Sequence, residues 1–512
     1  MTGMRLTASR RALGLRRCSP VTIRRNEPLG QVRTKIVATI GPASRDPVIL
    51  RDLLDAGVDV VRLNFSHGTH DDHSAVLETV RRVAEEAGRP IAVLQDLGGP
   101  KIRLGAIPGG AVDCVLGATF RLVPDRTSDD PTELTCTYRE LPDDLKVGNI
   151  LLFADGAVIM SVKEVAPQGV SLLVTLAGKL KSNQGINLPG AELKINALTE
   201  KDLRDLDWTA AHKVEYVGLS FVRKAADVDQ LRAELAARNC NARIVAKIEK
   251  PEAVDDLDAI IARTDAVMVA RGDLGVEMDV AQVPAIQKRI IAACHRARVP
   301  VITATQMLNS MEQSSRPTRA EASDVFNAVL DGTDAVMLSG ETAIGLYPIE
   351  AVSTMNRIAH EAETLLFSSD YSGNLQPLLN DPRSYDPITA TTDAVVEGAS
   401  LISRRLGSSL LVVATHSGRT ALALSKRRNA TPTLALADTA GNARVMALYW
   451  GVTPLVYPEI ANADDAMSFA MGWAEAQGLI KRGDKVVLVR GSVPGGGGHN
   501  SVMVREVGAS HA

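Results

Sequence analysis

The sequence has 512 residues, of which 45% are hydrophobic and 23% charged, and its formal net charge is −3. This length suggests about three domains of ordinary globular composition. The slight negative charge and the lack of a basic stripe in the body argue against nucleic acid as the main partner, and no apolar run is long enough to span a bilayer. The five cysteines are scattered without C-x-x-C spacing, which argues against disulfides and zinc and favours a cytoplasmic location.

The first 30 residues form a basic stretch with no acidic residue before Glu27. This composition permits two interpretations, an organellar transit peptide and a disordered extension. We expect a disordered basic extension over residues 1–30 on which the fold does not depend.

From Lys35 onward, short apolar runs alternate with amphipathic helical patterns. The runs predicted to be strands are 35–40, 58–63, 91–95, 216–221, 243–248, 266–270, 301–304 and 335–338. Helical patterns follow them, for example at 46–56, 71–86, 225–237, 284–296, 319–330 and 348–363. Eight strand and helix pairs predict an α/β fold, a (β/α)8 TIM barrel, formed by residues 31–96 and 193–366.

The third pair is interrupted by residues 97–192, where the helical period vanishes. Short β-type runs at 119–123, 150–153, 158–165 and 172–176 are separated by Gly, Pro and Asp. This pattern predicts an inserted small β-barrel domain. An insertion at the catalytic end of a barrel strand is well placed to act as a lid.

A loop-like stretch, residues 367–388, follows the barrel and is predicted to be a linker. A second α/β pattern then runs over residues 389–512, with strands at 410–414, 433–437, 452–456, 485–489 and 502–505. We interpret it as a C-terminal α/β regulatory domain.

The segment 244–277 combines a strand, an amphipathic segment predicted to be helical and a second strand, with charged residues at both strand ends. Lys247 and Glu249 are two residues apart and point to the same side of an extended chain, and a neighbouring parallel strand brings Asp273 alongside. Two carboxylates without His or Cys favour Mg²⁺ or Mn²⁺ over zinc. Gly272 leaves backbone N–H groups open to a substrate carboxylate. A purely structural ion pair between Lys247 and Glu249 stays open as an alternative.

The other barrel strand ends carry groups suited to phosphate chemistry. Arg62 and Arg103 can each present two parallel donors to a phosphoryl group. His67 by itself is more typical of a hydrogen-bonded structural histidine than of a base, and Thr305 by itself could cap a helix that starts there.

Several motifs together resemble pyruvate kinase, in the right order and over the chain from about Arg33 to Val507. They are TKIVATIGPAS at Thr34, RLNFSHG at Arg62, VAKIEKPEAV at Val245, VARGDLGVE at Val269, ATQMLNSM at Ala304, RPTRAEASDVFNAVLDGTDAVMLSGETA at Arg316, and TxSGRTA near Thr415. The resemblance implies transfer of the phosphoryl group of phosphoenolpyruvate to ADP, giving pyruvate and ATP. It also implies a barrel, a lid and a regulatory domain, and a homotetramer.

The resemblance assigns a role to each matching residue. Glu249 and Asp273 would hold the divalent cation, Mg²⁺ or Mn²⁺, and Lys247 would stabilise the transferring phosphoryl group and the enolate. The catalytic set would be Lys247, Arg62, Arg103, Thr305, Ser339 and Glu341, the last two linked to the water chain that protonates the enolate. Substrate would contact Arg62, Lys247, Gly272, Asp273 and Thr305, and the nucleotide would contact Asn64, His67 and Arg103.

Two other functions remain as alternatives. A metal-dependent carbon-carbon lyase acting through pyruvate enolate also needs a Glu and Asp metal site, but has no use for Arg62, Arg103 and a lid. The other alternative is a catalytically silent regulatory relative, against which the intact Lys247, Glu249 and Asp273 set argues.

The chain departs from the family pattern at two places. Ser182, Asn183 and Gln184 stand where members often have a lysine pair, although Lys179 and Lys181 could reach the nucleotide. Many members bind K⁺ beside the phosphoryl group. The corresponding residues here are Asn64, Ser66, Asp96, Leu97 and Lys101, with Leu97 in place of Thr and Lys101 in place of Glu. Because an ammonium group would repel K⁺ and supply its charge, we expect that K⁺ is not required. The alternative is that Lys101 only projects into solvent.

The C-terminal domain carries a candidate effector site. Its residues are Thr415, Ser417, Gly418, Arg419 and Thr420, at a strand-to-helix turn that suits a phosphate. The glycine-rich stretch 494–498 is expected either to close over this turn or to be a flexible hairpin. We expect activation by a phosphorylated metabolite.

Overall fold

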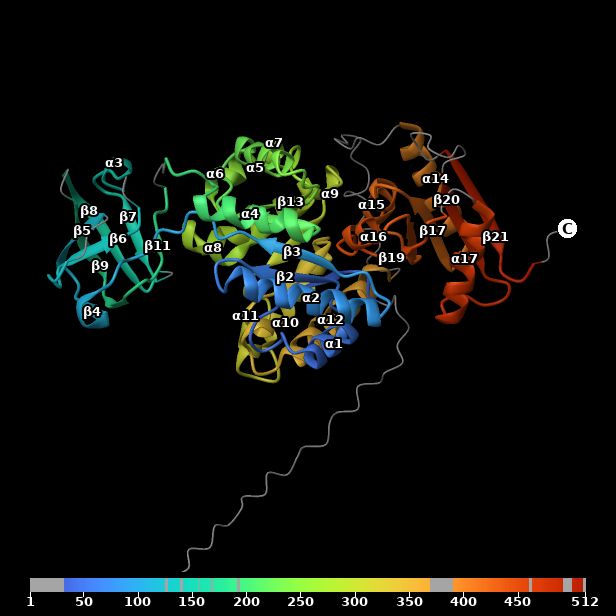
Figure 1. Ribbon diagram of the computed structural model, residues 1–512, viewed down its shortest axis with the longest axis horizontal. Helices are drawn as coiled ribbons and strands as arrows, with labels where there is room; N and C mark the ends of the chain where they lie inside the picture. The colour runs from blue at the N-terminus through green and yellow to red at the C-terminus, as the bar shows by residue number, and fades with distance from the viewer. Residues whose placement is uncertain are drawn as a thin grey trace, which may run out of the picture.

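The computed structural model describes residues 32–124, 128–138, 141–154, 156–166, 169–190, 194–368, 390–459, 463–490 and 500–509. The predicted basic extension, nearly all of the predicted linker and the glycine-rich stretch 494–498 lie outside these residues. The described chain forms three parts in a row, with the barrel between a β-rich part and the C-terminal α/β part (Figure 1).

A closed barrel of parallel strands forms the middle part of the described chain, in the order β1-β16-β15-β14-β13-β12-β3-β2. Its strands are almost completely buried, since helices cover them outside and side chains fill the interior. The predicted TIM barrel is therefore confirmed. The strands are β1 (Lys35–Thr39), β2 (Val60–Asn64), β3 (Ala92–Asp96), β12 (Tyr216–Leu219), β13 (Arg243–Ile248), β14 (Ala266–Ala270), β15 (Val301–Ala304) and β16 (Ala335–Leu338).

Some of the barrel helices begin at side-chain caps. Thr69, Thr199 and Thr318 each form a capping box at the start of a helix. The segment predicted to be helical between β13 and β14 is divided at Asp256 into two short helices. The helices are α1 (Pro47–Ala56), α2 (His70–Glu86), α4 (Glu200–His212), α5 (Ala225–Ala237), α6 (Pro251–Asp255), α7 (Leu257–Ile261), α8 (Arg271–Glu277), α9 (Val283–Arg296), α10 (Arg319–Leu330), α11 (Gly340–Ala343) and α12 (Pro348–Leu366).

The insertion lies between β3 and α4, as predicted. Its described residues form a six-stranded sheet in the order β11-β7-β8-β9-β5-β6 and a two-stranded sheet of β10 and β4 around their own apolar core. The sequence analysis did not predict the short strands β4, β6, β10 and β11. The strands are β4 (Ala111–Cys114), β5 (Thr119–Pro124), β6 (Glu133–Cys136), β7 (Ile150–Phe153), β8 (Val158–Ala166), β9 (Gly169–Leu176), β10 (Gly178–Lys181) and β11 (Ile186–Asn187), with helices η1 (Pro108–Gly110) and α3 (Leu141–Asp144).

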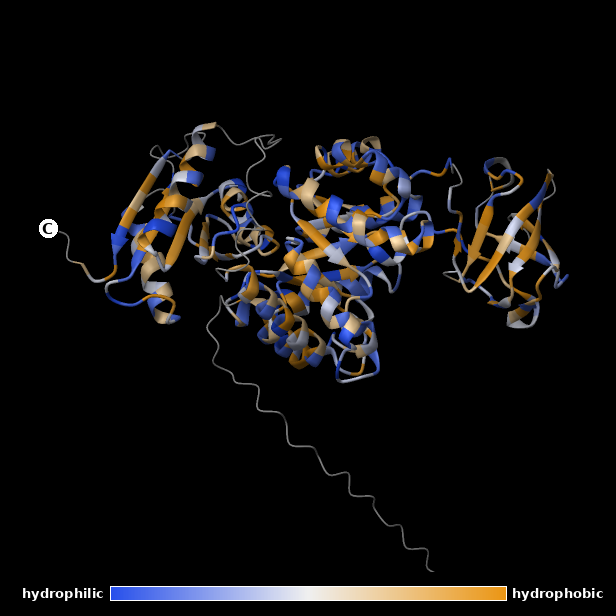
Figure 2. Cartoon of the chain, turned by 180° about the vertical axis from the view of Figure 1, so that it is seen from behind, coloured by the Kyte–Doolittle hydropathy of each residue, from blue (hydrophilic) through white to orange (hydrophobic). Residues whose placement is uncertain are grey.

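The C-terminal part holds, among its described residues, a five-stranded sheet in the order β19-β18-β17-β20-β21. Only β21 is antiparallel to its neighbour. The strands of both outer parts are predominantly hydrophobic (Figure 2). The elements are α14 (Ala390–Leu406), β17 (Leu410–Thr415), α15 (Arg419–Lys426), β18 (Thr433–Ala437), α16 (Ala440–Met446), β19 (Val452–Val456), α17 (Ala463–Ala476), β20 (Lys485–Arg490) and β21 (Ser501–Glu506).

Buried charges join the barrel to the C-terminal part. Asp334, directly before β16, accepts a hydrogen bond from Lys426 Nζ at 2.6 Å and pairs with Arg428 Nη2 at 3.1 Å. All three residues are at most 5% exposed. Because a buried charge is costly without its partner, this pairing favours one fixed arrangement of the two parts.

No helix of the described chain is long and apolar enough to cross a membrane.

Candidate active site

The carboxyl ends of β2, β3 and β13 bring four charged side chains together. Lys247 Nζ lies 2.6 Å from Glu249 Oε1 and 3.3 Å from Asp96 Oδ1. It also donates a hydrogen bond to Ser220 Oγ at 2.8 Å. Arg62 Nε donates to the other oxygen of Asp96, Oδ2, at 2.7 Å. The ion pair between Lys247 and Glu249 therefore exists, but as part of a larger buried cluster.

The charges of this cluster shift one another's pKa values. Burial alone would lower the pKa of Lys247, but Asp96, Glu249 and Asp273 raise it above its usual value. Burial alone would raise the pKa of Asp96, but Lys247 and Arg62 hold it below its usual value. Burial raises the pKa of Glu249, and repulsion from Asp273 adds to this effect while Lys247 opposes it. A cation near Glu249 and Asp273 would offset the repulsion between these two carboxylates.

The first turn of α8 lies beside the residues that follow β15. The Gly272 N–H donates a hydrogen bond to Thr305 Oγ1 at 2.7 Å. The sequence analysis expected this N–H to be open to a substrate carboxylate. In the structure the threonine hydroxyl instead accepts the hydrogen bond that the carboxylate would take. Asp273 is exposed on the same turn.

Thr305 does not cap a helix, because the next helix, η3 (Asn309–Glu312), begins four residues later. Thr305 and Gln306 instead adopt φ angles of 66° and 56°. A left-handed conformation costs about 1–3 kcal/mol for a residue with a side chain, and such strain is common at functional sites. Arg271 Nη2 supports this turn by donating to the Thr305 carbonyl oxygen at 2.8 Å.

Ser339 and Glu341 follow β16 and are directly linked. The Ser339 N–H donates to Glu341 Oε2 at 2.7 Å, and the Leu308 N–H donates to Oε1 at 3.0 Å. Burial raises the pKa of Glu341. The Ser339 hydroxyl oxygen is buried and has no hydrogen-bond partner among the residues that the structure describes. A buried orphan hydroxyl needs a partner such as a bound water or ligand.

The loop after β2 carries the predicted nucleotide and phosphoryl contacts. Asn64 Oδ1 accepts a hydrogen bond from the Ser66 N–H at 3.1 Å. Burial, and then the charges of Lys101, Arg103 and Arg62, lower the pKa of His67. The positive charges of Lys101, Arg103 and Arg62 therefore reach the exposed loop that carries His67.

The chain that leaves β3 passes from the cluster into the insertion. Leu97 is buried, and its carbonyl oxygen accepts a hydrogen bond from Ser220 Oγ at 2.8 Å. Lys101 is exposed to solvent, yet partial desolvation by the surrounding protein, and then the charge of Lys247, lower the pKa of Lys101. Arg103 Nη1 approaches the Asn183 carbonyl oxygen at 3.5 Å within the insertion.

The donor set at the cluster fits a hard divalent cation. Within the described residues, no group of three or more His, Cys, Asp and Glu is placed to hold a metal ion. The carboxylates of Glu249 and Asp273 nevertheless suffice for Mg²⁺, which typically binds one or two protein carboxylates and fills its other positions with water and substrate oxygens.

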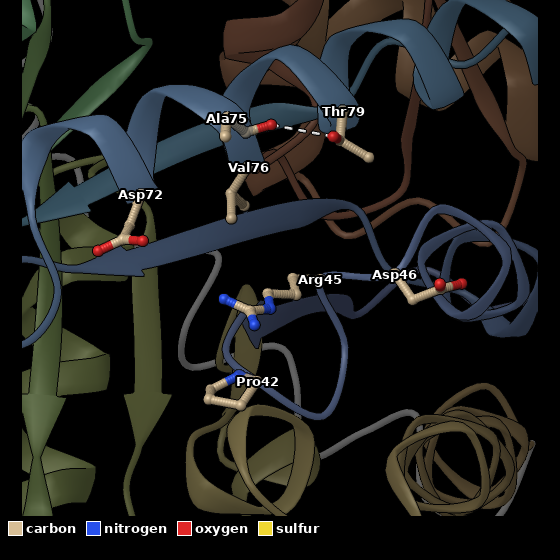
Figure 3. A pocket seen from close by; sticks show the side chains of 7 residues that line it. All are labelled: Pro42, Arg45, Asp46, Asp72, Ala75, Val76 and Thr79. Atoms are coloured by element: carbon tan, nitrogen blue, oxygen red, sulfur yellow. Dashed lines mark hydrogen bonds between the residues drawn. The ribbon is translucent and has the colours of Figure 1, made fainter.

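A hollow of about 430 Å³ lies between the turn before α1 and the first turns of α2 (Figure 3). Pro42, Arg45, Asp46, Asp72, Ala75, Val76 and Thr79 line it. The sequence analysis did not assign these lining residues to a site, although Pro42 lies within the TKIVATIGPAS motif.

The predicted effector residues lie on the C-terminal part, at the turn from β17 to α15. Gly418 has a φ of 77°, and its N–H donates to Thr415 Oγ1 at 3.1 Å. Arg419 Nε approaches Ser417 Oγ at 3.4 Å, and Thr420 lies in the first turn of the helix.

Comparisons with known proteins give the same assignment for both halves of the chain. The family model described as pyruvate kinase, barrel domain, matches residues 31–352, and that described as pyruvate kinase, alpha/beta domain, matches residues 393–505. The chain belongs to the pyruvate kinase family. It accordingly transfers the phosphoryl group of phosphoenolpyruvate to ADP, giving pyruvate and ATP, and members of the family require a divalent cation, generally Mg²⁺.

Individual members are similar over most of their length. A pyruvate kinase of Mycobacterium tuberculosis is 41% identical over 93% of this chain and 98% of its own. Pyruvate kinase 2 of Synechocystis is 40% identical over 93% of this chain and 79% of its own. The crystal structure of a pyruvate kinase from Cryptosporidium parvum superposes with a TM-score of 0.87, at 32% identity, over 93% of this chain and 96% of that one. These findings favour the kinase over the lyase and the silent relative.

Some residues of the pyruvate kinase cluster were missed by the sequence analysis. Ser220 binds both Lys247 and the Leu97 carbonyl oxygen, and Thr39 Oγ1 accepts a hydrogen bond from Arg62 Nη1 at 2.9 Å. Both lie at or just after the carboxyl ends of barrel strands, β12 and β1. The rule that this edge carries the chemistry could therefore have found them.

The contact between Gly272 and Thr305 predicts a sharp steric effect. A Cβ at residue 272 would lie 3.2 Å from Thr305 Oγ1, whereas a Cβ at Gly275, in the same helix, would lie 3.8 Å from its nearest neighbour. We expect Gly272→Ala to lower kcat/KM for phosphoenolpyruvate by about 10- to 100-fold through misplacement of the hydroxyl. Gly275→Ala, the matched control, should remain near wild type. Equal activity of the two variants would contradict this account.

Proposed function

We propose that the cluster of Lys247, Glu249 and Asp273 is the centre at which the phosphoryl group leaves phosphoenolpyruvate. The observation that carries this proposal is the buried Lys247 ammonium between two carboxylates, 2.6 Å from Glu249 and 3.3 Å from Asp96. When bound by Glu249 and Asp273, the divalent cation supplies positive charge to the substrate carboxylate and to the enolate oxygen.

The residues around this centre divide the remaining work. Lys247 and Arg62 offer donors to the phosphoryl oxygens, and Arg103 adds a third cation from the insertion. The Gly272 N–H and the Thr305 hydroxyl, which bind each other at 2.7 Å, would exchange that hydrogen bond for bonds to the substrate carboxylate. The enolate left after transfer is protonated through a water chain.

Two buried groups support the assignment of the water chain. Ser339 Oγ is buried without a partner in the described chain, and Glu341 is held at 2.7 Å from the Ser339 N–H. Because its pKa is raised, Glu341 binds a proton more readily than an ordinary carboxylate and can pass it on through water.

The nucleotide half of the reaction fits the exposed side of the cluster. We place the ADP phosphates near Asn64, His67 and Arg103, where positive charge gathers. The hollow lined by Pro42, Arg45 and Asp72 includes the first turn of α2, the helix that follows this loop, and we propose it as room for the nucleoside. Lys179 and Lys181, both exposed on β10, remain available in place of the lysine pair that this chain lacks.

Removal of the Lys247 ammonium tests the central assignment. We expect Lys247→Met to lower turnover at least about 100-fold, because the charge that develops on oxygen loses its nearest cation. Mn²⁺ affinity, measured by calorimetric titration, should change little, whereas Glu249→Gln should weaken it. Turnover near wild type in a folded Lys247→Met protein would remove this lysine from the mechanism.

We propose further that Lys101 replaces a monovalent cation. Desolvation and the charge of Lys247 lower the pKa of Lys101, and the negative charges of Glu249, Asp273 and Asp96 partly offset this lowering. The Leu97 carbonyl oxygen already accepts a hydrogen bond from Ser220. These features support the proposal of a positive charge on Lys101 at the place where many family members recruit K⁺.

This proposal predicts full activity in buffer free of K⁺ and NH₄⁺, with Mg²⁺ still required. Lys101→Glu should gain activity when K⁺ is added, since the substitution changes the local charge by two units. Lys163→Glu, which makes the same charge change at an exposed position of β8, is the control and should stay independent of K⁺. A large stimulation of the unmodified enzyme by K⁺ would contradict the proposal.

We also propose that the turn from Thr415 to Thr420 binds a phosphorylated effector. Its hydroxyl groups, the N-terminus of α15 and Arg419 suit a phosphate. Arg243 Nη2, at the start of β13, donates to the Ser417 carbonyl oxygen at 3.0 Å, so the turn contacts the strand that carries Lys247.

A panel of sugar phosphates and nucleoside monophosphates should therefore include a compound that shifts the phosphoenolpyruvate saturation curve to lower concentration. Arg419→Met should remove this shift and leave the curve without effector unchanged. A panel that leaves the curve unchanged would exclude the effector site.

We propose that the enzyme is cytoplasmic and forms the homotetramer that the family implies. Sedimentation of the purified enzyme should give the mass of a tetramer.

A further inference from the structure

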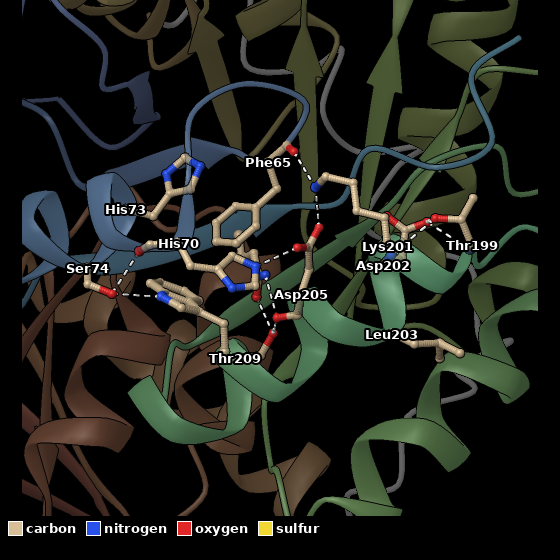
Figure 4. Close-up of polar contacts among 12 residues, drawn as sticks. Phe65, His70, His73, Ser74, Thr199, Lys201, Asp202, Leu203, Asp205 and Thr209 are labelled. Atoms are coloured by element: carbon tan, nitrogen blue, oxygen red, sulfur yellow. Dashed lines mark hydrogen bonds and ion pairs between the residues drawn. The ribbon is translucent and has the colours of Figure 1, made fainter. Parts of the chain in front are cut away.

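Lys201, in the first turn of α4, binds the loop between β2 and α2. Lys201 Nζ donates to the Phe65 carbonyl oxygen at 2.8 Å and to Asp205 Oδ2 at 2.6 Å (Figure 4). The other carboxylate oxygen of Asp205, Oδ1, lies 2.7 Å from His70 Nε2. The Asp205 side chain is only 2% exposed. The buried Asp205 carboxylate thus links Lys201 to His70, the first residue of α2.

The peptide group between Phe65 and Ser66 is held at both ends. Lys201 binds its carbonyl oxygen, and Asn64 Oδ1 accepts its N–H at 3.1 Å. The second bond also fixes which way the Asn64 amide faces. A rotation of this peptide would therefore displace Asn64 and Ser66 together.

Packing fixes the Phe65 ring but not this peptide. The ring stacks on His73 with centroids 4.0 Å apart and meets Trp208 edge-on at 4.9 Å. These contacts anchor the side chain whatever the direction of its carbonyl group. Among the described residues, Lys201 holds the carbonyl end of this peptide and Asn64 Oδ1 holds its N–H end, and so the direction of the peptide depends on these two hydrogen bonds.

The neighbouring residue holds the second segment of the site. Asp202 Oδ1 accepts a hydrogen bond from the Gly99 N–H at 3.2 Å, on the chain that runs to Lys101 and Arg103. Adjacent residues of one helical turn thus hold the two segments that meet at the phosphoryl group. A residue at this turn is suited to setting their relative position.

We propose that Lys201 is a positioning residue for phosphoryl transfer, which acts by orienting the Phe65–Ser66 peptide and thereby Asn64 and Ser66. The inference rests on the proposed place of Asn64 beside the ADP phosphates. The Lys201 side chain is 52% exposed, and exposed ion pairs contribute little to stability. Its loss should therefore reduce turnover much more than folding.

Three single variants test the inference in the full-length enzyme. We expect Lys201→Met to lower kcat by about 10- to 100-fold, with KM for phosphoenolpyruvate within about twofold of wild type, because a displaced catalytic group costs rate. Lys201→Arg, which keeps a donor, should recover most of this loss. Lys213→Met, at the exposed opposite end of α4, removes the same charge and should have no effect.

A double variant shows whether Lys201 acts through Asn64. Groups that act as a unit are not additive, so Lys201→Met should cost little further kcat in an Asn64→Ala background. Full additivity, or a kcat loss that follows a fall in melting temperature and is not restored by Arg, would overturn the inference. So would unchanged kcat in Lys201→Met when Asn64→Ala is slow. Unchanged kcat in Asn64→Ala would instead refute the proposed role of Asn64, and the inference with it.

Discussion

The site depends on one buried arrangement of charge, in which Lys247 and Arg62 face Asp96 and Glu249 at the carboxyl ends of three barrel strands. Two cations and two carboxylates are neutral together, which lowers the cost of burying each of them. Asp273 adds an exposed negative charge beside this neutral group. The arrangement therefore retains an attraction for a divalent cation, while Lys247 stays protonated because its neighbours raise its pKa.

The barrel could be predicted closely from the sequence because parallel strands buried on both faces appear as continuous apolar runs. The bounds of β13, β14, β15 and β16 equal the predicted ranges. The insertion was predicted less completely, since strands as short as Ile186–Asn187 leave no periodic pattern. The split between α6 and α7 was missed for a similar reason, because Asp256 interrupts the helix without a Gly or Pro.

For the site, the sequence indicated the groups on strand ends but not the groups that hold them. Lys247 and Glu249 are recognisable because they are charged residues at the end of an apolar run. Lys201 lies on an ordinary amphipathic helix, 136 residues from the carbonyl oxygen that it binds. Only the fold brings such residues together, and the same holds for the charges around Asp334. The roles of the site residues stay predictions until the variants above are measured.

The strand β13 connects the two ends of the barrel in a way that limits how an effector can act. Arg243 contacts the Ser417 carbonyl oxygen at one end, and Lys247 lies four residues further, about 13 Å away at about 3.3 Å per residue. β13 pairs with β12 and β14 on both sides and is buried, so it cannot slide alone. Lys426 and Arg428 also bind Asp334 at the base of β16. An effector at the β17 turn, as proposed above, would therefore act by moving the C-terminal part and the barrel as one rigid body rather than by deforming one strand.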